Sequence, residues 1–378
     1  MSIYLDNAAT TPLHPDVLDE MIHVLRTHYG NPSSIHKYGR EAKTVVEQSR
    51  KTIAAMLNTS PSEIFFTSSG TEADNTAIYS SVMTLGIKHV ISSAIEHHAV
   101  LHPLQHLEKK GLISLHMVQH REDGSIDTAQ LSNLAQQYPG SLISIMHANN
   151  EIGNLNPIEE IGTIARKYQC LFHTDTVQTL GHLPLDLQQL PVDFITGSAH
   201  KFHGPKGVGM LYINGELKID PFIHGGAQER NMRGGTEHVA GIAGMARALQ
   251  IAVDEQAADK AYVSGLKKYM ASQLREAIPG ITFYGTSADT EKSLYTILNA
   301  GIPATPIGDM LLFSLDIQGI AVSGGSACSS GTNVGSHVLD HLHPGDERIA
   351  LRFSFSKFNT KEEIDSVIAT LQKVLEKG

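Results

Sequence analysis

The fold is decided by residues 142–173, which read LISIMHANNEIGNLNPIEEIGTIARKYQCLFH. Leu142–Met146 and Cys170–His173 are short apolar runs typical of strands, and Ile158–Tyr168 between them has the pattern of a helix. Two strands that are joined through a helix pair in parallel, with the helix on one face of the sheet. This unit therefore predicts an α/β protein with a mainly parallel sheet.

The same alternation extends toward the N-terminus and beyond residue 173. Further strands are expected at Ile64–Thr67, His89–Ser92, Leu112–Val118 and Phe194–Thr196, and helices after Pro15 and at about 40–57, 72–82, 100–110 and 128–137. Val208–Ile213 follows too short a connection for a crossover, so we expect it to pair antiparallel. These elements predict a large domain near residues 16–256, with helices on both faces of its sheet.

A near-continuous helical pattern spans about Val239–Ala277 and leads into the last part of the chain. The alternation then resumes with Tyr295–Leu298, Met310–Asp316 and Leu351–Phe355, and a final helix is expected at Lys361–Leu375. We therefore expect a smaller α/β domain that combines residues 257–378 with the N-terminal arm, residues 1–15.

The composition is that of an ordinary globular protein. The 378 residues are 41% hydrophobic and 18% charged, and 29 Lys and Arg stand against 39 Asp and Glu, a net charge of −10 with His neutral. This balance argues against a protein that binds nucleic acid or a membrane surface. The N-terminal residues lack the basic and apolar regions of a signal peptide, and two cysteines imply no disulfide framework. We expect a cytoplasmic enzyme.

The turn Ser68-Ser69-Gly70-Thr71-Glu72-Ala73 joins a predicted strand to a predicted helix. Free backbone N–H groups at the start of that helix, with the neighbouring hydroxyls, would form a cradle for an anion such as a phosphate. The same residues fit a plain helix cap, with Ser69 or Thr71 as the capping residue and Glu72 complementing the helix dipole. The turn alone leaves both interpretations open.

Two predicted strand ends carry an acid and an amine. Asp175 follows the strand Cys170–His173, and Lys201 follows the strand Phe194–Thr196 in a turn rich in Gly and Pro. Ligands of open α/β sheets bind at the carboxyl ends of strands. There a carboxylate could hold a protonated ring nitrogen, and an amine could form a Schiff base with a carbonyl. An Asp that caps the next segment and a solvated loop lysine are the alternatives.

A Gly- and Ser-rich segment, Ser323–Ser336, carries Cys328. Nine of its fourteen residues are Gly or Ser, so we expect an exposed, mobile loop. A thiol on such a loop could act as a nucleophile, although an incidental surface cysteine is the alternative. Cys170 lies in an apolar strand and is expected to be an inert core residue.

Histidine is abundant, with 21 residues, which raises the question of a metal site. His337 and His341 have the spacing of neighbours on one helix face, and His343 follows them. A solvated, partly capping helix end explains the same spacing, and the sequence has no CxxC or HExxH pattern. We therefore expect no intrinsic metal site.

Taken together, these motifs resemble the NifS/IscS-type cysteine desulfurases of the class-V pyridoxal-phosphate-dependent aminotransferase superfamily. The resemblance runs almost end to end, from Tyr4–Thr11 to Leu351–Phe355. Further matching segments are Ser33–His36, Asn149–Gly153, Gly225–Glu229 and Arg233–Glu237. The resemblance implies fold type I of the pyridoxal-phosphate-dependent transferases, with a large cofactor-binding domain and a small domain that carries the mobile cysteine loop at about 323–336.

The resemblance also implies pyridoxal 5′-phosphate as the cofactor. Lys201 would carry the cofactor covalently, and Asp175 would pair with its ring nitrogen. His97 would stack on the ring and could move protons. The other residues expected to contact the cofactor are Gly70, Thr71, Asn150, Gln178, Ser198, His200 and, across a homodimer interface, Thr236, which would reach the partner subunit's phosphate.

The implied activity converts L-cysteine to L-alanine and leaves the sulfur as a persulfide on Cys328. Lys201 and His97 are the other expected catalytic residues. Asn150 and Arg352 would position the substrate, because an arginine fork binds a carboxylate through two hydrogen bonds. The sulfur would pass to a protein acceptor or an iron–sulfur scaffold, for cluster assembly or tRNA thiolation, and Cys328 could transiently ligate a cluster with such a partner.

Two departures and two alternatives bear on this interpretation. Thr176 stands where the family usually has alanine, and the residues after Cys328 lack the Glu-Pro-Ser sequence of close relatives. A class-V aminotransferase or β-lyase without persulfide transfer would also use Lys201 and Asp175, but it leaves Cys328 without a role. A non-enzymatic binding or assembly module would retain no cofactor.

Overall fold

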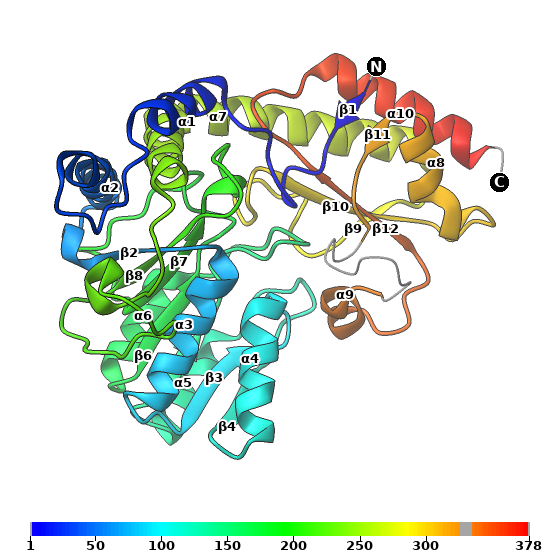
Figure 1. The fold of residues 1–378 in the computed structure, drawn as a ribbon. Coiled ribbons are helices and arrows are strands. Elements are labelled where there is room, and N and C mark those ends of the chain that lie inside the picture. The colour runs from blue at the N-terminus through cyan, green and yellow to red at the C-terminus, as the bar shows by residue number, and fades with distance from the viewer. Residues whose placement is uncertain (1, 325–334, 377–378) are drawn as a thin grey trace.

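A seven-stranded sheet forms the centre of the larger part of the molecule (Figure 1). The computed structural model describes residues 2–324 and 335–376. The strand order is β2-β8-β7-β6-β5-β3-β4, with parallel pairing from β7 to β4 and antiparallel pairing of β8 with both β7 and β2. The strands are β2 (Ile64–Thr67), β3 (His89–Ser93), β4 (Ser114–Val118), β5 (Leu142–Ser144), β6 (Leu171–Asp175), β7 (Phe194–Ser198) and β8 (Gly209–Ile213). The predicted mainly parallel sheet with one antiparallel strand is confirmed.

Helices cover both faces of this sheet because successive strand residues point to opposite sides. Val90 and Leu142 pack among residues of α3 and α4, whereas Ile91 and Ile143 pack among residues of α2, α5, α6 and α7. Both faces are therefore apolar, as expected for a parallel sheet that is buried on each side. The helices up to this point are α1 (Pro15–Thr27), α2 (Lys37–Met56), α3 (Gly70–Met83), α4 (His98–Lys109), α5 (Thr128–Gln137) and α6 (Ile158–Lys167).

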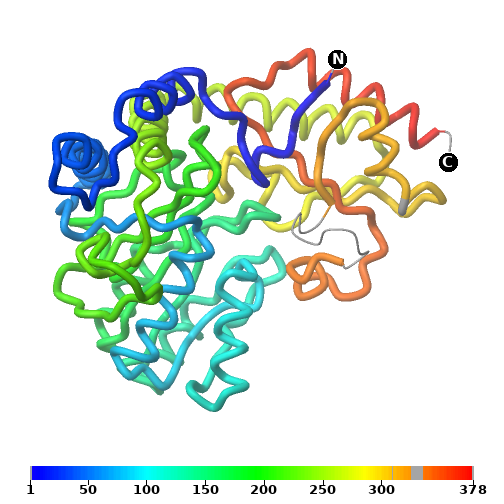
Figure 2. Tube along the Cα trace, viewed as in Figure 1, coloured from blue at the N-terminus to red at the C-terminus, as the bar shows by residue number. Residues whose placement is uncertain are grey.

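The smaller part of the molecule combines both ends of the chain, as Figure 2 shows. β1 (Ile3–Tyr4) pairs in parallel with β11 (Ile320–Ala321), and β10 (Ile297–Ile302) pairs antiparallel with β9 (Thr282–Phe283) and β12 (Ile349–Ser354). The helices here are α8 (Leu311–Ile317), α9 (His337–Leu342) and α10 (Lys361–Leu375). The segment expected at Met310–Asp316 is thus a helix, and the strand expected at Tyr295–Leu298 begins two residues later.

The two parts share one long helix, α7 (Val239–Ala277), of 39 residues. Apolar buried residues between Ile242 and Ile251 belong mostly to the core around the large sheet, and those from Val263 to Leu274 belong to the core around β10 and β12. The expected boundary after residue 256 falls inside this continuous helix, and the division into domains stays a prediction. Within the described ranges, no helix has both the length and the apolar character needed to cross a membrane.

The core around β10 and β12 contains the side chain of a lysine, Lys267. Lys267 of α7 is fully buried, and its ammonium donates hydrogen bonds to Ser293 Oγ at 2.7 Å and to the carbonyl of Leu294 at 2.9 Å. Burial disfavours the charged form and lowers the pKa of Lys267 to about 7. The core around β10 and β12 therefore contains a lysine whose pKa lies near neutral pH.

Candidate active site

The carboxyl ends of β6 and β7 open into a cavity of about 310 Å³, where they meet the starts of α3 and α4, the N-terminal arm and β12. This place agrees with the rule that open α/β sheets bind ligands at the carboxyl ends of their strands. The predicted site residues that line the cavity are Gly70, Thr71, His97, Asn150, Asp175, Gln178, Ser198, His200, Lys201 and Arg352. Residues scattered over most of the chain are thus brought to one cavity.

Two predicted site residues are not found there. Thr236 is exposed and is absent from the lining of its own chain's cavity. Cys328 lies outside the described residues. Cys170, the cysteine that is described, is buried in the core as predicted, with its sulfur 3.2 Å from Ser141 Oγ.

Lys201 reaches the cavity from η2 (Ala199–Lys201), the single turn that follows β7. Its ammonium donates to the carbonyls of Ala8 at 2.6 Å and Ala9 at 2.9 Å. The N-terminal arm therefore covers the amine, and a ligand that engages the amine must take over these contacts.

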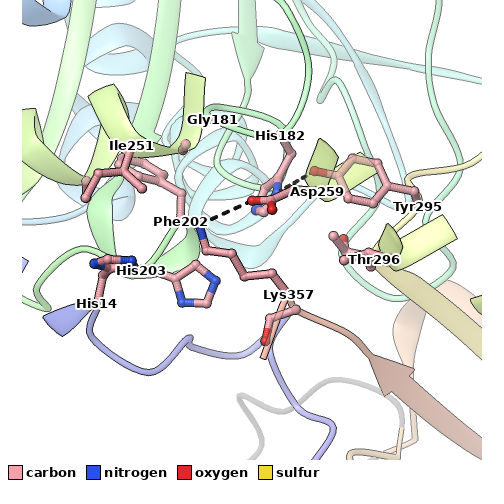
Figure 3. A pocket seen from close by; sticks show the side chains of 14 residues that line it. His14, Gly181, His182, Phe202, His203, Ile251, Asp259, Tyr295, Thr296 and Lys357 are labelled. Carbon is pink, nitrogen blue, oxygen red and sulfur yellow. Dashed lines mark hydrogen bonds and ion pairs between the residues drawn. The ribbon is translucent and has the colours of Figure 1, made fainter. Parts of the chain in front are cut away.

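A second, smaller cavity of about 20 Å³ is lined in part by Phe202 and His203, the residues that follow Lys201 (Figure 3). His182 bridges the two parts of the molecule, because its Nε2 is 3.0 Å from the carbonyl of Lys201 and its Nδ1 is 3.1 Å from the hydroxyl of Tyr295. The ion pair of Lys357 and Asp259, at 3.3 Å, lies on the same cavity. This space has room for about one water molecule and is too small for a cofactor.

Asp175 ends β6 and is 7% exposed as a whole residue, and its Oδ1 accepts the backbone N–H of Val177 at 2.8 Å. Burial raises the pKa of Asp175 to about 7, and the negative charge of Asp74 adds to this effect. Asp74, one turn into α3, is fully buried, and burial raises its pKa to about 8. A cation placed beside these carboxyl groups would favour the ionised form of Asp175.

His97 is the N-cap residue of α4, and its Nδ1 accepts the backbone N–H of Ala99 at 3.1 Å. That hydrogen bond assigns the proton of the neutral ring to Nε2. Burial, followed by the charge of Lys201, lowers the pKa of His97 to about 4. The ring is therefore neutral at physiological pH, as a flat group that stacks on an aromatic ligand should be.

Arg352 enters the cavity from β12 with its side chain 2% exposed. Its two terminal nitrogens donate to the carbonyl of Asn150 at 2.9 Å and to Asp6 Oδ1 at 3.0 Å. Its buried Nε has no hydrogen-bond acceptor among the described residues. An anionic ligand in the cavity would supply an acceptor for this guanidinium.

The start of α3 confirms the helix-cap interpretation of the Ser68–Ala73 turn, whereas the phosphate cradle stays a prediction. Ser69 caps the helix, because its Oγ accepts the backbone N–H of Glu72 at 3.2 Å. The same turn lines the cavity through Ser69, Gly70 and Thr71. A Cβ on Gly70 would lie 2.7 Å from Val177 Cγ2, so the residue must be glycine for the backbone to sit this close to the cavity wall.

Sequence reasoning missed several residues of the cavity wall, namely Ala8, Ala9, Asp74, Met146, Glu151 and His337. Asp74 follows Gly70 by one helical turn, and this spacing is a signal that could have found it. Ala8 and Ala9 carry no reactive group and act through their carbonyls. His337, considered above as a metal ligand, lies with its Nδ1 3.1 Å from His98 Nε2.

The cavity fits pyridoxal 5′-phosphate. A volume of about 310 Å³ suits a small aromatic ligand, and the donor set combines an amine, a buried carboxyl group, a neutral imidazole and a helix start open to a phosphate. The fold and this donor set are those of a pyridoxal-phosphate-dependent enzyme.

Residues 3–367 match the family described as aminotransferase class-V, and the chain belongs to that family. It is 42% identical to the cysteine desulfurase IscS of Dictyoglomus turgidum over 99% of this chain and 95% of the relative. It is 39% identical to the putative cysteine desulfurase IscS 1 of Bacillus subtilis over 99% of each chain. Among solved structures, a NifS-like protein has 38% identity and a TM-score of 0.92, covering all of both chains. A NifS-like protein from Rickettsia africae has 31% identity and a TM-score of 0.89, again over both full chains.

Proposed function

We propose that this chain is a pyridoxal-phosphate-dependent cysteine desulfurase that converts L-cysteine to L-alanine. The observation that carries the proposal is the meeting of Lys201, Asp175 and Arg352 in one cavity, each from a different element. The full-length similarity to proteins named cysteine desulfurase supports the same reaction. The bound cofactor supplies an electron sink for the bonds at the substrate Cα.

Each of the cavity residues has a separate role in the proposed reaction. Asp175 would hold positive charge at the ring nitrogen of the cofactor, and His97 would stack on that ring as a neutral imidazole. Arg352 would orient the substrate through its carboxylate, and its guanidinium also donates to the carbonyl of Asn150. The amine of Lys201 would remove the Cα proton of the substrate and return a proton later. Gln178 would support the ring hydroxyl of the cofactor, and its amide donates to the carbonyl of Ala8 at 3.1 Å.

The phosphate of the cofactor would lie at the start of α3. The backbone N–H groups of Gly70 and Thr71 and the side chains of Ser198 and His200 are the proposed donors. His200 is held in place, because its Nδ1 is 3.1 Å from Thr10 Oγ1. This arrangement supports one anion-binding site for each chain.

The sulfur would move to Cys328. The substrate C–S bond breaks and a new S–S bond forms with the Cys328 thiolate, so that L-cysteine and the enzyme thiol give L-alanine and an enzyme persulfide. Atoms and electrons balance without an added oxidant. We propose a protein sulfur acceptor or an iron–sulfur scaffold as the recipient of this sulfur.

The experiment that tests this function compares the two cysteines of the chain. After incubation with L-cysteine, mass analysis should find one additional sulfur atom on Cys328 and none on Cys170, together with L-alanine in solution. Cys328→Ser should keep the bound cofactor and lose sulfur transfer, while the matched variant Cys170→Ser should keep activity. Substantial release of alanine and sulfide by Cys328→Ser would contradict the persulfide mechanism.

We further propose that the enzyme is a cytoplasmic homodimer in which Thr236 of each subunit reaches the partner's phosphate. The exposed position of Thr236, outside its own cavity, supports this role. Exposed apolar side chains gather on the α1–α2 connection, where Tyr29 is 70% and Ile35 is 91% exposed, and these would be covered in a dimer. The low number of cysteines supports a reducing compartment.

A further inference from the structure

The segment from Ile223 to Gly235 forms a loop whose two ends lie close together. The backbone N–H of Gly234 donates to the carbonyl of Ile223 at 2.9 Å, and a Cβ on Gly234 would lie 2.6 Å from the Cα of Gly225. Three consecutive residues in this loop, 229–231, have φ values of 44°, 56° and 67°. None of them is glycine, so the left-handed backbone is strained and needs support from its surroundings.

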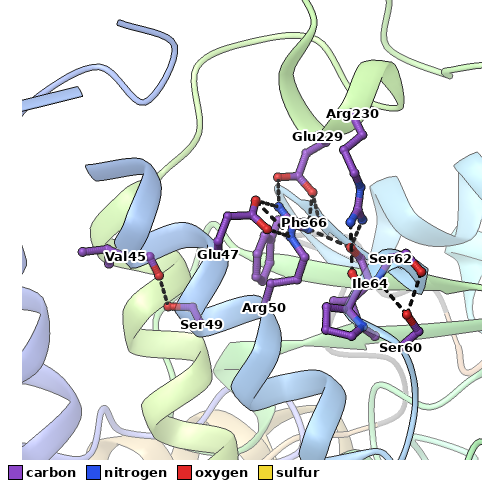
Figure 4. A network of polar contacts seen from close by, with 11 residues as sticks. Val45, Glu47, Ser49, Arg50, Ser60, Ser62, Ile64, Phe66, Glu229 and Arg230 are labelled. Atoms are coloured by element: carbon purple, nitrogen blue, oxygen red, sulfur yellow. Dashed lines mark hydrogen bonds and ion pairs between the residues drawn. The ribbon is translucent and has the colours of Figure 1, made fainter. Parts of the chain in front are cut away.

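Two arginines tie this loop to β2 (Figure 4). The buried Glu229 forms a paired contact with Arg50 at 2.7 and 2.8 Å, and its Oε2 also accepts the backbone N–H of Phe66 at 2.8 Å. Arg230 donates to the carbonyl of Ile64 at 2.8 Å. Since β2 is an edge strand of the sheet, the loop's side chains take the place of a further strand.

A third arginine ties the loop to the proposed phosphate cradle. Arg233 donates from Nε to Glu72 Oε1 at 2.9 Å and from Nη2 to Glu72 Oε2 at 3.1 Å. Glu72 lies in the first turn of α3, two residues after Gly70, with its side chain 8% exposed. Its Oε2 also accepts the backbone N–H of Ser68 at 2.9 Å.

A negative charge on Glu72 would repel a phosphate bound at the start of α3, beside Gly70 and Thr71. Burial opposes the ionisation of Glu72, but hydrogen bonds from Arg233 and Ser68 outweigh it and keep its pKa below the usual range. A carboxylate at a helix start competes with a phosphate for the same backbone N–H groups and repels it. With Arg233 paired to it, Glu72 brings no net negative charge and is directed toward the loop.

We propose that Arg233 is a positioning residue for the cofactor phosphate, acting by neutralising Glu72 and holding it away from the cradle. The inference rests on the proposed pyridoxal-phosphate site and adds to it a residue that contacts neither cofactor nor substrate.

The test measures cofactor affinity rather than turnover. Holoenzymes of the wild type, Arg233→Gln, Glu72→Gln and the double variant are dialysed, and the binding of pyridoxal 5′-phosphate and of pyridoxal is measured by absorbance. Arg233→Gln should bind pyridoxal 5′-phosphate roughly tenfold more weakly, and adding Glu72→Gln should restore most of that loss. Affinity for pyridoxal, which has no phosphate, should stay within about twofold of the wild type in all variants.

Three outcomes would overturn this role. In the first, the double variant binds as weakly as Arg233→Gln, so the charge of Glu72 is not the cause. In the second, pyridoxal affinity falls by the same factor as that of the phosphate form, which indicates general disruption. In the third, the matched variant Arg230→Gln, which loosens the same loop but leaves Glu72 paired, shows the same phosphate-specific loss. A wild type that binds no pyridoxal phosphate at all would instead contradict the proposed function.

Discussion

The buried Lys267 predicts how the stability of this protein depends on pH. In the unfolded chain a lysine has a pKa near 10.5, and in the folded protein burial lowers it to about 7. Between these values the unfolded state binds more protons than the folded state, so the free energy of unfolding rises with pH. The pKa difference of about 3.5 corresponds to a penalty of about 5 kcal/mol that is complete below pH 7 and relieved as pH approaches 10.5.

Lys267→Met isolates this penalty. The variant loses hydrogen bonds to Ser293 and Leu294, but that cost is the same at every pH, whereas the ionisation penalty is absent. From pH 6 to pH 9 the free energy of unfolding of the wild type should therefore rise by about 2–3 kcal/mol relative to the variant. Urea unfolding followed by circular dichroism at each pH measures it.

The neighbouring exposed lysine supplies the control. Lys268 lies on the same helix but on its exposed side, so Lys268→Met should follow the wild type at every pH. A difference between the wild type and Lys267→Met that is constant from pH 6 to pH 9, or that changes in the opposite direction, would refute the reasoning.

Three further predictions concern the active site. Arg352→Gln should raise KM for L-cysteine by roughly 30- to 150-fold, since a charge-assisted carboxylate contact contributes about 2–3 kcal/mol, with the absorbance of the bound cofactor unchanged; an unaltered KM would remove Arg352 from substrate binding. Gly70→Ala should weaken cofactor binding because its Cβ would meet Val177 Cγ2 at 2.7 Å, and adding Val177→Ala should recover affinity if crowding is the cause. Thr236→Ala should speed cofactor loss from a dimer, and light scattering that finds a fully active monomer with undiminished cofactor affinity would contradict the shared site.

The sequence predicted the large sheet well because its signals are local. Apolar runs of strand length separated by amphipathic helices fix the order of the elements, and Asp175 and Lys201 could be placed at strand ends from the sequence alone. The antiparallel sheet of β9, β10 and β12 was not foreseen, since its strands are joined by long connections that leave pairing open. The segment at Met310–Asp316 shows the same limit, because a short apolar run does not distinguish a strand from a helix.

Site residues were predictable from the sequence where the side chain itself has a group suited to the reaction. Residues that act by contacting another side chain were not predictable. No local sequence signal indicates that Arg233 pairs with Glu72. The two residues are 161 positions apart, and no periodicity joins them. The same holds for Asp74, whose importance comes from full burial beside Asp175 rather than from its sequence context.

The continuous helix α7 constrains how the chain can change length. Its 39 residues correspond to about 58 Å of rigid rod. One residue inserted between Ile251 and Val263 would turn everything beyond it by about 100° and advance it by about 1.5 Å, which would move β12 and Arg352 out of line with the strand ends of the large sheet. Insertions and deletions in this stretch should therefore disturb the alignment of Arg352 with the strand ends of the large sheet.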